Sequence, residues 1–304
     1  MITTKKIQIV EVGPRDGLQN EKEWVPTETK ISLIEKLADA GLTKIEVTSF
    51  VSPKWVPQLK DAYEVFTGIK QISSVSYPVL TPNMKGFERA LEADAKEIAV
   101  FGAASETFSQ KNTNCSIDES INRFRPVLEE AQKKNIPVRG YISCVLGCPY
   151  QGNVPVEDVV NLATKMTEMG CFQISLGDTI GAGTPLQAKR MVQKVSEKVP
   201  VSKLALHFHD TRGQALANIY ACLELGVSVI DTSVAGLGGC PYAKGASGNV
   251  ATEDVVFMLN GMNIETGIDL KKLVDTGRFI STFFGRLPQS SVSASTLNDH
   301  LQLN

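Results

Sequence analysis

Two histidines, His207 and His209, lie two positions apart in an apolar segment, residues 204–210. The segment has the pattern of a β-strand, in which side chains two positions apart point to the same face. Two imidazoles on one face at the end of a strand can bind one divalent cation. A pair of packed histidines that bind backbone groups is the more common explanation of an isolated pair. The other polar residues of the chain therefore decide between a metal site and a packing role.

An arginine and an aspartate, Arg15 and Asp16, follow the first predicted strand, residues 7–12. In an ordinary turn they would form a solvent-exposed ion pair. At an active site, Asp16 offers an oxygen ligand and Arg15 a fixed positive charge for a developing oxyanion. Asp16 with His207 and His209 makes a set of two imidazoles and one carboxylate, and these ligand types admit Mg²⁺, Mn²⁺, Fe²⁺ or Zn²⁺.

Two more carboxylates lie in or at the end of predicted strands. Glu46 lies within residues 44–50, where a buried carboxylate needs a cation to offset its desolvation, and Arg15 is the candidate. A structural pair with another Lys or Arg is the alternative. Asp178 ends the sixth predicted strand, where two roles are about equally well supported: it orients a site residue from behind, or it caps the following helix.

A glycine-rich segment, residues 235–249, follows the eighth predicted strand and indicates a mobile lid. Cys240 within it would bring a thiol to the site on closure, suited to proton transfer. Asn249 offers an amide oxygen as a further ligand, and Glu253 just beyond it is the candidate to support it. A flexible linker or a phosphate-binding loop with an inert, buried cysteine is nearly as well supported.

Three further residues are candidate contacts for an anionic substrate, although surface or packing roles are more common for each: Lys22, Arg139 and Tyr141. Cys144 and Cys148 have the spacing of half a zinc site, but no second Cys or His pair completes a tetrahedral set. We therefore assign both cysteines to the wall of the fold or to a loop.

The elements that must position these residues alternate between short β-branched runs and stretches with helical spacing. Successive strands begin about 25 to 40 residues apart, which is the length of a strand, a crossover helix and two loops. Eight such units predict an α/β fold, the (β/α)8 TIM barrel. An open doubly wound sheet usually shows a G-x-G-x-x-G turn after its first strand, and this chain has none there. The predicted strands are residues 7–12, 44–50, 72–77, 97–102, 137–143, 172–177, 204–209 and 229–234.

A single domain, residues 1–304, is expected, with a small C-terminal helical extension and tail over about residues 262–304. In a barrel the carboxyl ends of the strands carry the active site, which is where the candidate residues lie. Hydrophobic residues make up 42% and charged residues 21%, which is typical of a soluble globular protein. The net charge of -2 gives no positive field to hold nucleic acid.

The longest uncharged stretch, residues 140–156, contains Pro149 and Pro155, so no membrane span is expected. The N-terminus passes within a few residues into a strand pattern, which leaves no room for a targeting peptide. The six cysteines lack the dense spacing of a disulfide scaffold and are expected to be reduced thiols. We therefore expect a cytoplasmic protein.

Four motifs resemble the 3-hydroxy-3-methylglutaryl-CoA lyases: VGPRDGLQN from Val12, IEVTSFVSPKWVPQ from Ile45, HFHDTRG from His207 and GLGGCPYA-x-GASGN from Gly236. The similarity runs from the first strand to about Leu297, and long motifs in the correct order are highly specific. It implies a metal-dependent TIM-barrel lyase that acts on an acyl-CoA in leucine degradation, and a homodimer formed through the C-terminal helices. The resemblance also implies the site: metal ligands Asp16, His207, His209 and Asn249, catalytic residues Arg15 and Cys240, and Glu46 supporting Arg15.

Cleavage of 3-hydroxy-3-methylglutaryl-CoA to acetoacetate and acetyl-CoA requires loss of a proton from a tertiary alcohol and stabilisation of a thioester enolate. A hard cation on that hydroxyl lowers its pKa without redox chemistry, so Mg²⁺ or Mn²⁺ suits better than Zn²⁺. Asp16 or His207 would accept the hydroxyl proton, and the sequence does not choose between them. Arg15 would stabilise the enolate oxygen, and Cys240 would protonate the enolate carbon.

Two other classes of protein are consistent with parts of this pattern. A Claisen-condensing synthase, such as isopropylmalate or homocitrate synthase, uses a similar barrel but generally carries a further C-terminal region and a TLRDG motif where this chain has GPRDG. A catalytically silent barrel that serves as a scaffold has no need of the polar residues that occur together here: Arg15, Asp16, His207, His209, Cys240 and Asn249.

Overall fold

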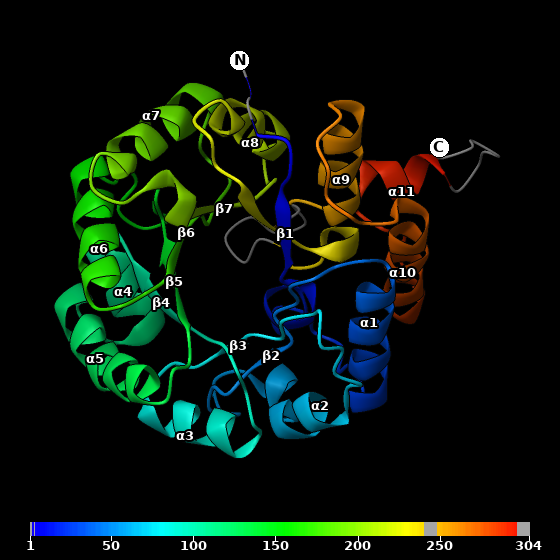
Figure 1. The fold of residues 1–304 in the computed structure, drawn as a ribbon, viewed down its shortest axis with the longest axis horizontal. Coiled ribbons are helices and arrows are strands. Elements are labelled where there is room, and N and C mark those ends of the chain that lie inside the picture. Colours follow the sequence, from blue (N-terminus) through cyan, green and yellow to red (C-terminus); the bar gives the residue numbers. More distant parts are fainter. Residues whose placement is uncertain (1, 3, 240–247, 297–304) are drawn as a thin grey trace.

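Eight parallel strands curl into a barrel that is surrounded by helices (Figure 1). The computed structural model describes residues 2, 4–239 and 248–296. Neighbouring strands follow the order β1-β8-β7-β6-β5-β4-β3-β2, which confirms the predicted (β/α)8 TIM barrel. The strands are β1 Gln8–Glu11, β2 Thr48–Ser49, β3 Val79–Leu80, β4 Ile98–Ala103, β5 Val138–Ser143, β6 Gln173–Asp178, β7 Leu204–Phe208 and β8 Val229–Thr232.

Backbone hydrogen bonds between β1 and the residues just before β2 close the barrel. The N–H of Glu11 donates to the Lys44 carbonyl at 3.0 Å, and the N–H of Glu46 donates to the Glu11 carbonyl at 2.9 Å. Because this seam joins the end of β1 to the segment that carries Glu46, the loop after β1 begins beside that residue.

Successive side chains along each strand point alternately to the outer core and to the barrel interior. On β7, Leu204, Leu206 and Phe208 belong to the large apolar core between strands and helices. Ala205 belongs to a small apolar cluster inside the barrel, and His207 continues the same inward face. A parallel strand is ordinarily apolar on both faces, so an inward histidine marks a departure that needs a functional or structural reason.

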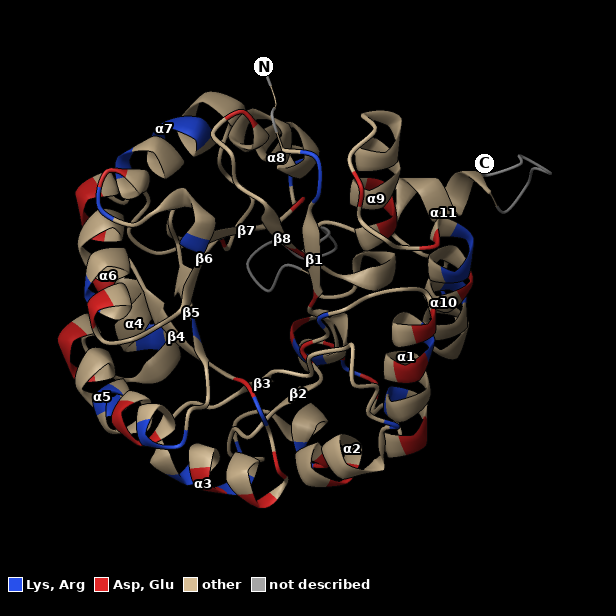
Figure 2. Cartoon of the chain, viewed as in Figure 1, with Lys and Arg blue, Asp and Glu red and all other residues tan. Residues whose placement is uncertain are grey.

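Helices cover the outside of the barrel, and Lys and Arg are interspersed with Asp and Glu over their outer surfaces (Figure 2). The longest of them, α5, begins at a capping box in which Ser116 and Glu119 bind each other's backbone N–H groups. The helices up to β8 are α1 Thr27–Asp39, α2 Ala62–Gly68, α3 Met84–Glu92, α4 Glu106–Thr113, α5 Ile117–Lys133, α6 Val156–Glu168, α7 Pro185–Ser196 and α8 Ala215–Leu223.

Among the described residues, three α-helices follow β8: α9 Thr252–Gly261, α10 Leu270–Phe283 and α11 Ser291–Ser295. Helix α10 packs against α1 and against the short turn η4 (Val234–Gly236), and α11 packs against α9. The predicted C-terminal helical extension is therefore present, and it lies beside the first helix of the barrel (Figure 1). Within the described ranges, every helix is too short or too polar to cross a membrane.

The third strand lies later than the sequence predicted. Residues 72–77 were expected to form it, but β3 is Val79–Leu80. Ser73 and Ser74 are exposed, whereas both residues of β3 are buried. The earlier segment is therefore a loop that starts at the surface and becomes buried at Tyr77, and a short apolar run does not reveal where the strand itself begins.

Substitutions at two glycines with left-handed backbones can measure how closely the C-terminal helical extension approaches the barrel. Gly41, after α1, has φ +99°, and a Cβ there would lie 2.4 Å from the Gly267 carbonyl oxygen. Gly170, after α6, has φ +106° and no atom within 4 Å of such a Cβ. We expect Gly170→Ala to lower the free energy of unfolding by about 1 to 2 kcal/mol through backbone strain alone. Gly41→Ala should cost roughly 1 to 3 kcal/mol more, measured by denaturant unfolding, because the methyl group clashes. Equal losses would contradict the close approach.

Candidate active site

Three candidate side chains converge at the carboxyl ends of the strands. Asp16 lies in η1 (Gly13–Gly17), a single helical turn after β1, while His207 lies in β7 and His209 directly follows that strand. The ligand atoms of these three residues all lie within 4.8 Å of one another. His207 Nε2 is 3.8 Å from Asp16 Oδ2, and the two imidazole centroids are 5.5 Å apart. The fold thus gathers the carboxylate and both histidines into one cluster.

This donor set fits a divalent cation. Burial and the neighbouring His207 lower the pKa of His209 to about 4, so its imidazole is neutral at neutral pH. Its Nδ1 atom is buried and has no hydrogen-bond partner among the described residues. Burial alone would raise the pKa of Asp16, but Arg15 and the two histidines lower it to about 2, so the group is a carboxylate. An imidazole pair and a carboxylate are ligands that divalent metals accept.

The turn η1 depends on a close approach of the backbone at Gly17. The N–H of Asp16 donates to the Val12 carbonyl at 2.7 Å, which winds the chain tightly after β1. A Cβ at Gly17 would lie 2.8 Å from both Ser233 Oγ and Leu237 Cβ. The glycine therefore lets the turn lie against the residues that follow β8, and this contact brings Asp16 toward the opposite end of the chain.

Arg15 is buried at the rim and is held by two carboxylates. Its Nε donates to Glu46 Oε2 at 2.6 Å, and its Nη1 donates to Asp16 Oδ1 at 2.6 Å. The guanidinium carbon lies 5.4 Å from the centroid of the Tyr141 ring. Burial would lower the pKa of Arg15, but Glu46 and Asp16 raise it, so the charge is retained. Burial raises the pKa of Glu46, and Arg15 opposes that shift. Glu46 thus lies against Arg15, as its burial in the sequence pattern predicts.

Asn249 reaches the same carboxylate from the chain segment after β8. Its Nδ2 donates to Asp16 Oδ2 at 2.8 Å and to the Leu237 carbonyl at 3.3 Å, and its backbone pairs with His209 in an isolated bridge. A ligand role uses the amide oxygen, which is attached to the same carbon as the nitrogen that faces Asp16. Cys240 and residues 241–247 of the predicted lid lie outside the described residues.

A second acid, Asp231 of β8, reaches His207 from another direction. Asp231 Oδ2 lies 3.3 Å from His207 Nδ1. Arg139 donates to Asp231 Oδ1 at 2.6 Å and to Oδ2 at 3.0 Å, and Ser175 Oγ donates to Oδ2 at 2.7 Å. Asp231 is not among the site residues predicted from the sequence. An acid inside an apolar strand is the signal that drew attention to Glu46, and the same signal would have found it.

Arg139 is not placed to contact a substrate, which corrects the sequence prediction. Its side chain is fully buried in the barrel interior, where Nε donates to Gln173 Oε1 at 2.8 Å and Nη1 donates to Tyr141 Oη at 2.9 Å. Tyr141 lies between two cations, with its ring centroid 4.9 Å from the Arg139 guanidinium carbon and 5.4 Å from that of Arg15. Lys22 is exposed after η1, and its contact with a substrate stays a prediction.

The Asp178 carboxylate anchors a loop and does not cap the following helix, which was one of its two predicted roles. Its carboxylate accepts hydrogen bonds from the N–H groups of Ala182 and Gly183 at 3.1 and 2.8 Å, in the loop before α7. Thr184, not Asp178, caps that helix. Toward the site itself, Asp178 contributes its backbone: its carbonyl accepts from the N–H of His209 at 3.3 Å.

Glu253 supports η4 and α11, which corrects the expectation that it supports Asn249. Both of its carboxyl oxygens lie 3.0 Å from the N–H of Ala235, a non-glycine residue with φ +56°. Ser293 Oγ of α11 donates to Glu253 Oε1 at 3.2 Å, and no hydrogen bond to Asn249 occurs in the described part of the chain. Burial raises the pKa of Glu253 to about 8.

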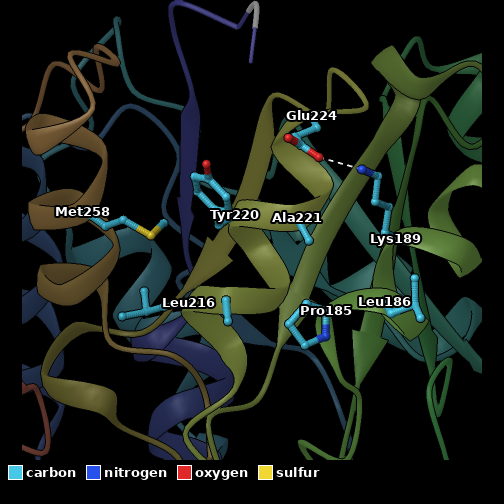
Figure 3. Close-up of a pocket in the computed structure, with 9 residues that line it drawn as sticks. Pro185, Leu186, Lys189, Leu216, Tyr220, Ala221, Glu224 and Met258 are labelled. Atoms are coloured by element: carbon cyan, nitrogen blue, oxygen red, sulfur yellow. Dashed lines mark hydrogen bonds and ion pairs between the residues drawn. The ribbon is translucent and has the colours of Figure 1, made fainter. Parts of the chain in front are cut away.

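A groove outside the barrel is separate from this cluster. It lies on helices α7, α8 and α9, has a volume of about 530 Å³, and is bordered by the ion pair of Lys189 and Glu224 at 2.5 Å (Figure 3). Its walls are mainly apolar and include Leu186, Tyr220 and Met258. Because none of the candidate residues lines it, the cluster at the strand ends is the candidate active site.

A (β/α)8 barrel whose rim gathers a carboxylate, two imidazoles and a buried arginine has the architecture of a metal-dependent barrel enzyme. The chain matches the model of the HMGL-like family over residues 6–280. It is 61% identical over 289 residues to the mitochondrial hydroxymethylglutaryl-CoA lyase of Gallus gallus, covering 95% of this chain and 97% of that one. It is also similar to the crystal structure of hydroxymethylglutaryl-CoA lyase from Pseudomonas aeruginosa, with a TM-score of 0.96, 56% identity and coverage of 98% and 99%.

The chain therefore belongs to the HMGL-like family, and it is a lyase. The resemblance that the four motifs indicated is confirmed. The predicted cytoplasmic location is contradicted, because the relative from Gallus gallus is mitochondrial. A relative from Mus musculus, 56% identical over 97% of this chain, is cytoplasmic. Closely similar chains thus occur in both compartments.

The buried carboxyl of Glu253 makes stability depend on pH. Its pKa is raised from 4.5 to about 8, so between these values the folded protein holds a proton that the unfolded chain has released. The free energy of unfolding therefore falls as the pH rises through this window. We expect Glu253→Gln, which removes the titration, to lose less stability than the wild type between about pH 5 and 8, by up to roughly 4 kcal/mol.

Denaturant unfolding at several pH values measures this difference. Glu88→Gln, which changes an exposed glutamate of α3, is the control and should keep the wild-type pH dependence. Parallel curves for the wild type and Glu253→Gln would show that this carboxyl is ionised in the folded protein.

Proposed function

We propose that this protein cleaves 3-hydroxy-3-methylglutaryl-CoA to acetoacetate and acetyl-CoA by a metal-assisted retro-Claisen reaction. The observation that carries the proposal is the convergence of Asp16, His207 and His209 beside the buried Arg15 at the barrel rim. A carbon-carbon lyase of this type needs a cation for the substrate hydroxyl and a fixed positive charge for the enolate, and the cluster offers a place for each.

The metal is proposed to be Mg²⁺ or Mn²⁺, held by Asp16, His207, His209 and the amide oxygen of Asn249. When bound, such a cation lowers the pKa of the substrate hydroxyl without redox chemistry. The unpartnered Nδ1 of the buried His209 and the ionised state of Asp16 support this assignment. Burial of a ring nitrogen without a hydrogen-bond partner costs free energy of folding. A cation bound in the cluster would be coordinated by the lone pair of one of the two imidazoles.

Different residues of the chain accept the proton, stabilise the enolate and return a proton to it. Asp16 or His207, whose facing atoms are 3.8 Å apart, accepts the hydroxyl proton. Arg15 stabilises the enolate oxygen, for which Nη2 is suited because no hydrogen bond within the described residues occupies it, while Nε and Nη1 are held by Glu46 and Asp16. Cys240 then protonates the enolate carbon, a role that rests on the motif GLGGCPY.

The remaining proposals concern the surroundings of the reaction. The exposed Lys22 contacts an anionic part of the acyl-CoA substrate, and Tyr141 forms a wall of the site beneath Arg15. By resemblance, the reaction belongs to leucine degradation and the enzyme is a homodimer that pairs through its C-terminal helices.

An assay for acetoacetate tests the proposed function. Incubation with 3-hydroxy-3-methylglutaryl-CoA and Mg²⁺ should yield acetoacetate, and His207→Ala should lower kcat by at least about 100-fold through loss of a ligand and candidate base. Lys96→Ala, which alters an exposed ion pair with Asp94, is the control and should keep wild-type turnover. Absence of acetoacetate from the wild type, with release of free thiol from acetyl-CoA and a 2-oxo acid, would instead favour a condensing synthase.

A cysteine variant separates proton donation from metal binding. Cys240→Ala should slow turnover by about 100-fold or more, as expected for loss of a general acid, while the affinity for Mn²⁺ changes little. Cys222→Ala, in the buried face of α8, serves as the matched control and should leave turnover unchanged. A large loss of Mn²⁺ affinity in Cys240→Ala would contradict its assignment as a proton donor.

A further inference from the structure

Asp231 and His207 are direct neighbours across two strands of the barrel. They are register partners in the pairing of β7 with β8, so their side chains lie on the same inward face. Asp231 is 2% exposed, and its Oδ2 atom lies 3.3 Å from Nδ1 of His207. The other ring nitrogen, Nε2, faces Asp16 Oδ2 at 3.8 Å. The imidazole is therefore placed between two carboxylates, one at each nitrogen.

The partners of Asp231 fix it as a hydrogen-bond acceptor. Arg139 donates to both carboxylate oxygens, at 2.6 and 3.0 Å, and can only donate. Ser175 Oγ donates to the same Oδ2 atom that faces His207, at 2.7 Å. A bidentate guanidinium favours the ionised carboxylate and holds it in one orientation. A carboxylate held in this way has no proton to offer to His207.

The contact therefore determines where the proton of a neutral His207 resides. Since Asp231 only accepts, Nδ1 must carry the hydrogen that lies between them, and Nε2 keeps its lone pair. That lone pair faces the cluster formed with Asp16 and His209. In metal sites the nitrogen that does not bind the metal commonly donates to a carboxylate, which fixes the ring in this way.

We propose that Asp231 is a positioning residue that holds His207 in the Nδ1–H tautomer with Nε2 directed to the metal site, and that Arg139 and Ser175 hold Asp231 in turn. The inference rests on the proposed function for the metal, but the tautomer itself is a property of the metal-free protein. With Nδ1 carrying the hydrogen and Nε2 directed to the metal, His207 has no free lone pair, so of the two candidate acceptors of the hydroxyl proton this tautomer favours Asp16. It gives the buried Arg139 a place in the site as the support of that acid, two contacts away from the cluster.

Replacing Asp231 by asparagine tests the tautomer. In Asp231→Asn the side-chain amide can donate to Nδ1, which moves the hydrogen of His207 to Nε2 and removes the lone pair from the metal site. The chain has three histidines, so ¹⁵N NMR of the histidine-labelled, metal-free protein can be assigned with His209→Gln and His300→Gln. At a pH about 2 units above the ordinary histidine pKa, we expect the Nδ1–H form of His207 in the wild type and the Nε2–H form in Asp231→Asn. The affinity for Mn²⁺ should fall by about 10- to 100-fold.

Glu97→Gln is the matched control for loss of a buried ion pair. Glu97 accepts from Lys44 at 2.7 and 2.9 Å and from Ser76 Oγ at 2.7 Å, which reproduces the partners of Asp231 at the amino end of β4. This variant should lose stability in the same way but keep both the His207 tautomer and the affinity for Mn²⁺.

Two results would overturn the proposal. The first is the Nε2–H form of His207 in the metal-free wild type, a measurement that requires no folded variant of Asp231. The second is an unchanged tautomer and unchanged Mn²⁺ affinity in Asp231→Asn. If the wild type shows the Nδ1–H form but binds no Mn²⁺, the proposed metal site fails while the assigned position of the proton stands.

Discussion

A buried positive charge balanced by two carboxylates determines the arrangement of the barrel rim. Arg15 can lie there because Glu46 and Asp16 each accept a hydrogen bond from it at 2.6 Å. Removal of one partner from such a group leaves a buried charge uncompensated, which typically costs about 3 to 5 kcal/mol. The same contacts lock the guanidinium against Tyr141, so the other polar groups of the rim are arranged around a cation that does not move freely.

A second buried guanidinium, paired with one carboxylate, lies inside the barrel. Arg139, close to the start of β5, is paired there with Asp231, and both are fully or almost fully buried. Small apolar clusters fill the remaining interior, one of them formed by Val10, Val12, Ala205 and Val229. Because these charges are shielded from water, each hydrogen bond among them is stronger than it would be at the surface, and each is harder to replace.

The sequence predicted those features that follow from local geometry. The spacing of His207 and His209 places both imidazoles on one face of a strand, and the cost of burying Glu46 requires a nearby cation. It did not predict partners chosen across the barrel, such as Asp231 for Arg139, which are 92 positions apart. It also misplaced the partners of Asp178, because a sequence does not reveal which backbone N–H groups a loop leaves without an acceptor.

The order of the strands has a consequence for the chain as it leaves the ribosome. Strand β1 lies between residues 44–46 and β8, so one of its edges finds a partner only when the last strand has been made. During most of synthesis the chain carries Arg15 and Asp16 without either imidazole, together with an open edge to which other chains can pair. The closed barrel and the cluster at its rim can therefore form only after the last strand has been made, so the site is assembled at the end of synthesis.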